Sequence, residues 1–92
     1  MKKISRSKQF NKDLRNIITK MGDKHFQALI GVIHDLANAD ELSPAYRDHA
    51  LKGKLSDYRE IHLGGDLLLI YRIEKEVIYL IRIGTHAEVL EM

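Results

Sequence analysis

The stretch YREIHLGGDLLLIY, residues 58–71, contains the pattern that decides the fold. Two runs of strand-forming residues flank the Gly-Gly-Asp sequence at 64–66, and this turn signal predicts an antiparallel β-hairpin. Polar side chains interrupt the runs within eight positions, namely those of Arg59, Glu60, His62 and Asp66. Their presence in a sheet raises the question of whether the strands present a functional site.

A third run of the same character, VIYLIRI, follows the hairpin after the short segment EKE. We therefore expect three consecutive antiparallel strands over Tyr58–Leu63, Leu67–Ile73 and Val77–Ile83. The last two are apolar at successive positions, as in strands that are covered on both faces of a sheet.

Upstream of the hairpin, apolar residues recur at helical spacing in two segments. The first segment starts after Ser7 and ends at Gly22, and Asp23 caps the second. The two amphipathic segments are joined by one or two residues and predict an antiparallel helical hairpin. Their apolar stripes are Phe10, Leu14, Ile17, Ile18 and Met21, and then Phe26, Leu29, Ile30, Ile33, Leu36 and Ala37.

The other segments complete a single domain over residues 1–92. Residues 2–7, KKISRS, fit a short first strand, and the tail HAEVLEM fits one or two closing helical turns. Residues 40–57 are polar and predict an irregular connection with at most one turn of helix. The order β-α-α-β-β-β predicts an α+β fold, with the helical hairpin packed on one face of a small antiparallel sheet.

The composition excludes several classes of protein. The chain has 92 residues and no cysteine, so its core is thin and it cannot use a disulfide framework. Its basic N-terminus leads into no apolar segment, unlike a secretory signal. The longest apolar stretch, Leu67–Tyr71, is far shorter than the ~20 residues of a membrane helix. We expect a soluble protein of the cytoplasm.

Charge is distributed unevenly along the chain. Residues 1–24 hold eight lysines and arginines against two aspartates, whereas the remaining residues hold seven basic against eleven acidic side chains. A basic N-terminal third suits a polyanionic partner such as nucleic acid. A solvated helix face explains the same charges more simply. Charge alone therefore does not decide the function.

Several polar residues stand at strand ends, which an antiparallel sheet can bring to one edge. His62 ends its strand with Asp66 across the turn, His86 follows the last strand, and His49 in the connection can fold over the same edge. Together with one or two arginines, such a set suits RNA cleavage by transesterification. Histidine serves as base or acid near neutral pH, and arginine stabilises the charge on the phosphorane without any metal.

Each of these residues also has a simpler interpretation. A histidine at a strand end is commonly a surface residue, Asp66 can be a turn former, and Arg59 can pair with a neighbouring acid. A zinc site built from the three histidines and Asp66 is a further alternative. However, a His-x3-Asp pair has ligand geometry on a helix, and this pair spans a Gly-Gly turn. His25 and His34 fit ordinary positions on the second helix.

The motifs in the second half of the chain resemble a known family. The order is D-H-x-L-x-G, then Y-R-x-x-H, D-x-x-L-I-Y and R-x-G-T-H, spread over residues 46–90. This order resembles the RelE/ParE superfamily of bacterial toxins, specifically its YafQ-like branch. The resemblance implies a cytoplasmic ribonuclease of a type II toxin–antitoxin module, which cuts mRNA in the ribosomal A site and is blocked by a cognate antitoxin.

The resemblance also implies roles for individual residues. It suggests His86 as the general acid and His49 or His62 as the general base, with Asp66 orienting or sharing that role. We expect phosphate contact from Arg82 and further RNA contacts from basic side chains, without a metal or other cofactor. These basic side chains are Arg59, Lys52 and Lys54.

Two departures and one alternative accompany the resemblance. Relatives often carry aromatic residues where this chain has Leu67 and Leu90, and leucine cannot stack on an RNA base. Codon preference and cutting efficiency are therefore open. The alternative is a ParE-like poison of gyrase, or a module that only binds its antitoxin, and the intact histidine set argues against both.

Overall fold

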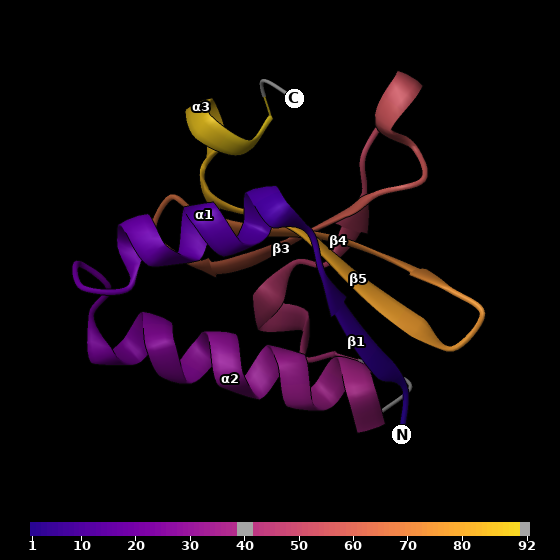
Figure 1. Ribbon diagram of the computed structural model, residues 1–92, viewed down its shortest axis with the longest axis horizontal. Coiled ribbons are helices and arrows are strands. Elements are labelled where there is room, and N and C mark those ends of the chain that lie inside the picture. The colour runs from indigo at the N-terminus through magenta and orange to yellow at the C-terminus, as the bar shows by residue number, and fades with distance from the viewer. Residues whose placement is uncertain (39–41, 91–92) are drawn as a thin grey trace.

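A five-stranded sheet forms the centre of the part that this computed structural model describes, residues 1–38 and 42–90 (Figure 1). Its strand order is β1-β5-β4-β3-β2. No helix within the described ranges has the length and apolar character needed to span a bilayer. The elements are β1 (Lys3–Arg6), α1 (Lys8–Ile17), α2 (Asp23–Asn38), η1 (Pro44–Tyr46), β2 (His49–Ala50), η2 (Gly53–Leu55), β3 (Arg59–Gly64), β4 (Leu67–Glu74), β5 (Val77–Thr85) and α3 (His86–Val89).

The three predicted strands form the antiparallel meander β3-β4-β5, and the α+β fold class is confirmed. The expectation of an entirely antiparallel sheet was wrong, because β1 pairs with β5 in parallel, with Lys3 opposite Val77. A tight turn forces antiparallel pairing, but β1 is followed by the helical hairpin and is free of that constraint.

The helical hairpin is present, although its first helix is shorter than predicted. The Ser7 hydroxyl caps α1 by accepting a hydrogen bond from the Phe10 amide at 2.9 Å. The helix ends at Ile17, and Ile18 is largely exposed. The chain reverses direction over the residues before Gly22, and α2 begins at Asp23. The last residues of the predicted apolar stripe therefore belong to the turn and not to the helix.

The sheet separates two apolar clusters. Phe10 of α1 and Val32 of α2 pack with Leu69 and Tyr71 of β4 on one face. On the other face, a smaller cluster joins Leu68 and Ile70 of β4 to Val89 of α3. Figure 1 shows α2 and α3 on opposite sides of the sheet. The prediction that β4 is covered on both faces is therefore confirmed.

The connection before β3 is more ordered than expected. It contains η1 and η2 and, between them, the two-residue strand β2, in which His49 lies opposite Glu60 of β3. The prediction missed this strand because two residues are too few to show an alternating pattern. Positions 40 and 41 of the predicted connection lie outside the described residues.

Candidate active site

The candidate active site lies at the β2 edge of the sheet, on the face opposite the helical hairpin. Pairing of β2 with β3 places His49 beside Glu60. Side chains alternate along a strand, so His62 shares the face of Glu60. At the end of β5, a capping box between Thr85 and Glu88 starts α3 and fixes His86 as its first residue.

Glu60 is the centre of the cluster. The residue is only 4% exposed, and Nε2 atoms of three histidines surround its carboxylate. Oε2 lies 3.3 Å from His49, and Oε1 lies 3.3 Å from both His62 and His86. Neighbouring rings, His49 with His62 and His62 with His86, have their centroids 5.9 Å apart. A buried carboxylate needs N–H donors nearby, which the Nε2 atoms of His62 and His86 can supply, because burial of an unpaired charge is costly.

His86 lies between two carboxylates. Its Nδ1 is 2.7 Å from Oδ1 of Asp66, while its Nε2 faces Glu60. The hydrogen bond from His86 lowers the pKa of Asp66. Because an ionised carboxylate only accepts hydrogen bonds, Nδ1 donates to Asp66, and the Nε2 edge of the ring is the one directed into the cluster.

His62 has a different hydrogen-bonding pattern. Nη2 of Arg47 lies 2.9 Å from its Nδ1. A guanidinium only donates, so Nδ1 accepts and the proton of the neutral ring resides on Nε2, towards Glu60. Burial, followed by the charge of Arg47, lowers the pKa of His62. The neutral form of this ring is favoured, and the lone pair on its Nδ1 already accepts from Arg47.

His49 completes the acid–base set. Its Nδ1 lies 2.7 Å from the backbone carbonyl oxygen of Arg47, which can only accept, so Nδ1 carries a proton. The other nitrogen, Nε2, faces Glu60. Of the two histidines considered as a base, His49 therefore has the nitrogen suited to exchange a proton with substrate.

The structure brings together His49, His62, Asp66 and His86, but it does not bring Arg59 to them. Arg59 projects from the opposite face of β3, where its Nε donates to Asp48 at 3.0 Å. The hydroxyl of Tyr71 donates to the same carboxylate oxygen at 2.8 Å. Burial and this bond raise the pKa of Tyr71. The RNA contact of Arg59 stays a prediction.

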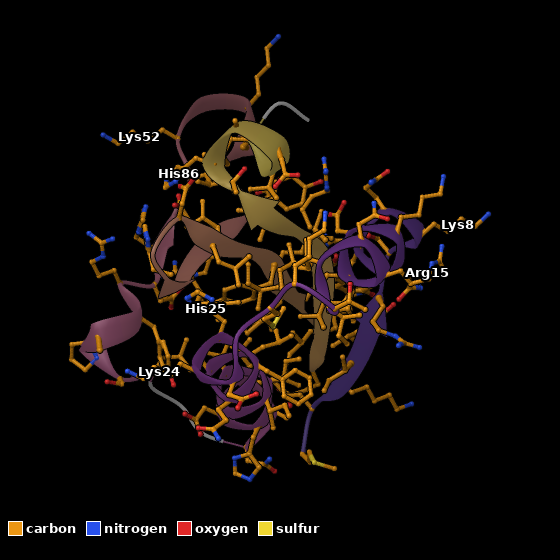
Figure 2. All side chains as sticks on the ribbon, turned by 90° about the vertical axis from the view of Figure 1, so that its left-hand side faces the viewer. Lys8, Arg15, Lys24, His25, Lys52 and His86 are labelled. Atoms are coloured by element: carbon orange, nitrogen blue, oxygen red, sulfur yellow. The ribbon has the colours of Figure 1, made fainter. Side chains whose placement is uncertain are left out.

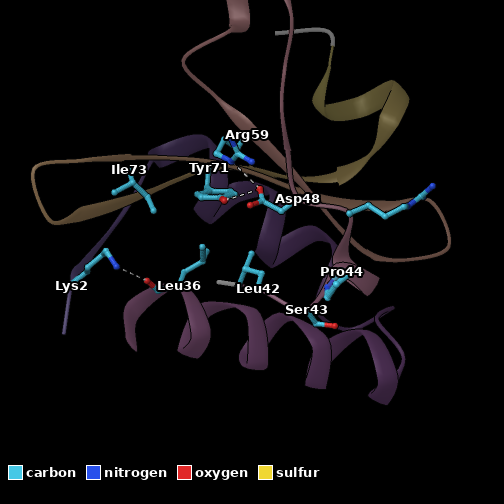
Figure 3. A pocket seen from close by; sticks show the side chains of 10 residues that line it. Lys2, Leu36, Leu42, Ser43, Pro44, Asp48, Arg59, Tyr71 and Ile73 are labelled. Carbon is cyan, nitrogen blue, oxygen red and sulfur yellow. Dashed lines mark hydrogen bonds and ion pairs between the residues drawn. The ribbon is translucent and has the colours of Figure 1, made fainter. Parts of the chain in front are cut away.

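The bonds to Asp48 border a cavity of about 530 Å³ between the end of α2 and the sheet (Figure 3). Figure 3 shows Asp48 between Arg59 and Tyr71 on one side and Leu42 on the other. Asp48 directly precedes His49, so these bonds fix the connection to the sheet next to the site.

The remaining basic candidates are placed differently. Nε of Arg82 donates to Asp13 at 2.7 Å and its Nη2 does so at 3.2 Å. Lys52 and Lys54 are exposed around η2, and Lys52 projects from the same side of the molecule as His86 (Figure 2). Their contacts with RNA stay predictions.

Sequence reasoning missed two members of the cluster, Glu60 and Arg47. A charged residue inside an apolar strand, on the same face as His62, was a usable signal for Glu60. No pattern marks Arg47, because its position depends on the conformation of the connection.

One subset of the cluster has the composition of a metal site. Ligand atoms of His49, Glu60 and His62 all lie within 4.8 Å of one another. Two imidazoles and a carboxylate suit zinc or another transition metal. This set differs from the zinc alternative considered from sequence, because Glu60 replaces Asp66 and His86.

The fold and the histidine–carboxylate cluster together match a small toxin domain of the RelE/ParE type. More particularly, the chain belongs to the YafQ family, whose description is "bacterial toxin of type II toxin-antitoxin system, YafQ" and whose model matches residues 2–91.

Several relatives are similar over nearly their whole length. An Escherichia coli K12 protein named mRNA interferase toxin YafQ is 31% identical and aligns over 91% of this chain and 90% of its own. A solved Helicobacter pylori structure, described as a metal-bound toxin, is 43% identical with a TM-score of 0.86, covering 97% of this chain and 99% of that one. The E. coli DinJ-YafQ complex contains a chain that is 30% identical with a TM-score of 0.84, over 97% and 98% of the two chains.

Proposed function

We propose that this chain is the toxin of a type II toxin–antitoxin module, an endoribonuclease that cuts ribosome-bound mRNA by acid–base transesterification. The arrangement of three histidines around the buried carboxylate of Glu60 carries the proposal. The name of the E. coli relative, an mRNA interferase, supports the same activity.

The geometry supports one role for each group. His49 Nε2 takes the proton of the ribose 2′-OH, and the 2′-oxygen attacks the adjacent phosphorus. The hydrogen bond from His49 Nδ1 to the Arg47 carbonyl oxygen orients this ring. The bond from phosphorus to the 5′-oxygen then breaks, and His86 Nε2 donates its proton to that oxygen. Asp66 orients His86 through Nδ1. The products are a 2′,3′-cyclic phosphate and a 5′-hydroxyl.

Dependence on the ribosome is supported by the openness of the site. The side chains of His49 and His86 are 54% and 49% exposed. The cavity of about 530 Å³ lies elsewhere, beside Asp48 and Arg59 on the hairpin side of the sheet. The chain thus supplies acid–base groups but little surface to hold a strand, and the ribosome supplies that constraint. We therefore expect it to act in the cytoplasm.

The expected protein partner is a cognate antitoxin, as in the E. coli DinJ-YafQ complex. The basic N-terminal third of this chain suits an acidic segment of such a partner. Lys8 and Arg15 project from α1, well away from His86 (Figure 2). An antitoxin bound at these residues would therefore occupy a surface separate from the catalytic edge.

Cleavage of a defined mRNA, free and on programmed ribosomes, tests the proposal. We expect cuts within the A-site codon, 2′,3′-cyclic phosphate ends and far slower cutting of the free mRNA. A protein in which both His49 and His86 are replaced by Gln is the control and should leave the message intact. Intact mRNA with wild-type protein, accompanied by inhibited DNA supercoiling, would instead establish the gyrase alternative.

A further inference from the structure

The connection between α2 and β3 delivers a second cation to the catalytic edge in addition to its histidine. We infer that Arg47 is a catalytic residue, whose guanidinium contacts the scissile phosphate and stabilises the negative charge of the phosphorane. The inference rests on the proposed function and adds a residue that the sequence did not indicate. Its basis is the contact of Arg47 Nη2 with His62 Nδ1 at 2.9 Å.

The side chain of Arg47 reaches the middle of the cluster. His62, which it contacts, lies between His49 and His86, with both neighbouring ring centroids 5.9 Å away. A phosphate placed between the base His49 and the acid His86 therefore lies within reach of the guanidinium. A guanidinium has five N–H donors, so one bond to His62 leaves donors for the phosphate.

The backbone of Arg47 is fixed, although its side chain is exposed. The residue adopts a left-handed conformation with φ of 49°, and its amide donates to Pro44 at 3.0 Å. Its carbonyl oxygen accepts from His49. The next residue, Asp48, is bound by both Arg59 and Tyr71. The guanidinium thus extends from an anchored segment, which favours a defined position in the site.

The other two arginines considered for this role are already engaged. Arg82 uses Nε and Nη2 in its bonds to Asp13. Arg59 binds Asp48 on the opposite face of β3. In contrast, none of the ion pairs among residues 1–38 and 42–90 involves Arg47. Its contact in the site is a neutral imidazole, which leaves its charge available to an anion.

Single-turnover cleavage on programmed ribosomes, at saturating toxin, tests the inference. We expect Arg47→Gln to lower the rate of the chemical step about 10²–10³-fold, the usual effect of losing a donor to transition-state charge. Arg47→Lys should recover part of the rate, because it keeps the charge but loses the fork. Arg6→Gln is the matched control, since β1 lies at the opposite edge of the sheet, and its rate should equal that of wild type.

A sulfur substitution separates phosphate contact from a structural role. With one diastereomer of an mRNA phosphorothioate at the cleavage site, wild type should slow markedly, and Arg47→Gln should show little further loss. If Arg47→Gln has a clearly lower melting temperature than wild type, the sulfur effect is compared between wild type and Arg47→Lys instead. Equal sulfur effects in wild type and the folded variants, or a near-normal rate for Arg47→Gln, overturn the inference while leaving the proposed function intact. Absence of cleavage by wild type overturns both.

Discussion

Asp13 of α1 and Arg82 of β5 are 69 positions apart in sequence and share two hydrogen bonds, of 2.7 and 3.2 Å. The same carboxylate accepts from the Ile83 amide at 3.1 Å and from Gln9 at 3.0 Å. The pair joins the helical hairpin to the strand that leads into His86. We therefore expect this ion pair to contribute mainly to the stability of the fold.

Replacing Asp13 by Asn should destabilise the fold. The carboxylate is buried and Arg82 is only 17% exposed, so the change leaves a largely desolvated guanidinium without its anion. We expect a loss of about 3 kcal/mol in the free energy of unfolding, measured by urea denaturation. Asp35→Asn on α2 is the matched control. A loss no larger than that of the control would contradict this role.

Acid should weaken the same pair. Burial alone would raise the pKa of Asp13, but hydrogen bonds from Arg82, Gln9 and Ile83 hold it below the ordinary value. A lowered carboxyl pKa gives stability that is complete above ~pH 5 and is lost as the pH falls through the folded-state pKa. Melting temperatures from pH 6 to pH 3 should fall more steeply for wild type than for Asp13→Asn. Parallel curves would refute the linkage.

Glu60→Gln should abolish most cutting while leaving a folded protein. Glutamine fills the same space but removes the negative charge that the three Nε2 atoms surround, and we expect a rate loss of about 10²-fold or more. Single-turnover cleavage and a thermal melt check this. Glu76→Gln, in the exposed turn before β5, serves as the control. Near-normal cutting by folded Glu60→Gln would remove this residue from the mechanism.

His86→Gln should also retain the fold and antitoxin binding but lose ~10²–10⁴-fold in rate, since it removes the proposed general acid. His34 is exposed on α2, so His34→Gln is the better control. His25 is less suitable, because a β-carbon at Gly64 would approach its ring to 2.8 Å, so this ring supports the turn before Asp66. Normal cleavage by folded His86→Gln would contradict the assignment of His86 as the general acid.

Zinc should inhibit the enzyme. A metal bound by His49, Glu60 and His62 would use the nitrogen lone pair that the base needs. We expect titration calorimetry to detect Zn²⁺ binding that Glu60→Gln weakens, and a chelator to restore cleavage. Undiminished cleavage by fully zinc-loaded protein would contradict the role of His49 as the base.

Much of the fold could be predicted because periodicity reports burial. Leu68 to Tyr71 are buried without interruption, which matches the continuous apolar run in β4. Strand ends likewise indicated that His62, Asp66 and His86 would meet. The position of Arg47 depends on a single left-handed residue, and pairing of the two-residue β2 is a long-range event. Neither leaves a local pattern in the sequence.

Leu67 and Leu90 illustrate a different limit. Both are partly buried, Leu67 against the hairpin-side cluster and Leu90 against the cluster beneath α3. At the two positions where the resemblance led us to expect aromatic residues, this chain thus has side chains that pack on its own cores. Codon preference depends on the RNA bases that meet this surface, so the two leucines do not determine it.

Because β2 is so short, the length of the connection before it determines on which face of the sheet His49 lies. Its two residues pair with Glu60 and Arg59, so the register places His49 on the catalytic face and Ala50 on the other. Shifting the pairing by one residue would exchange the two faces. The number of residues between the anchored Asp48 and the paired residues of β2 therefore fixes the register. A relative could lose activity through one inserted residue there while keeping every catalytic side chain.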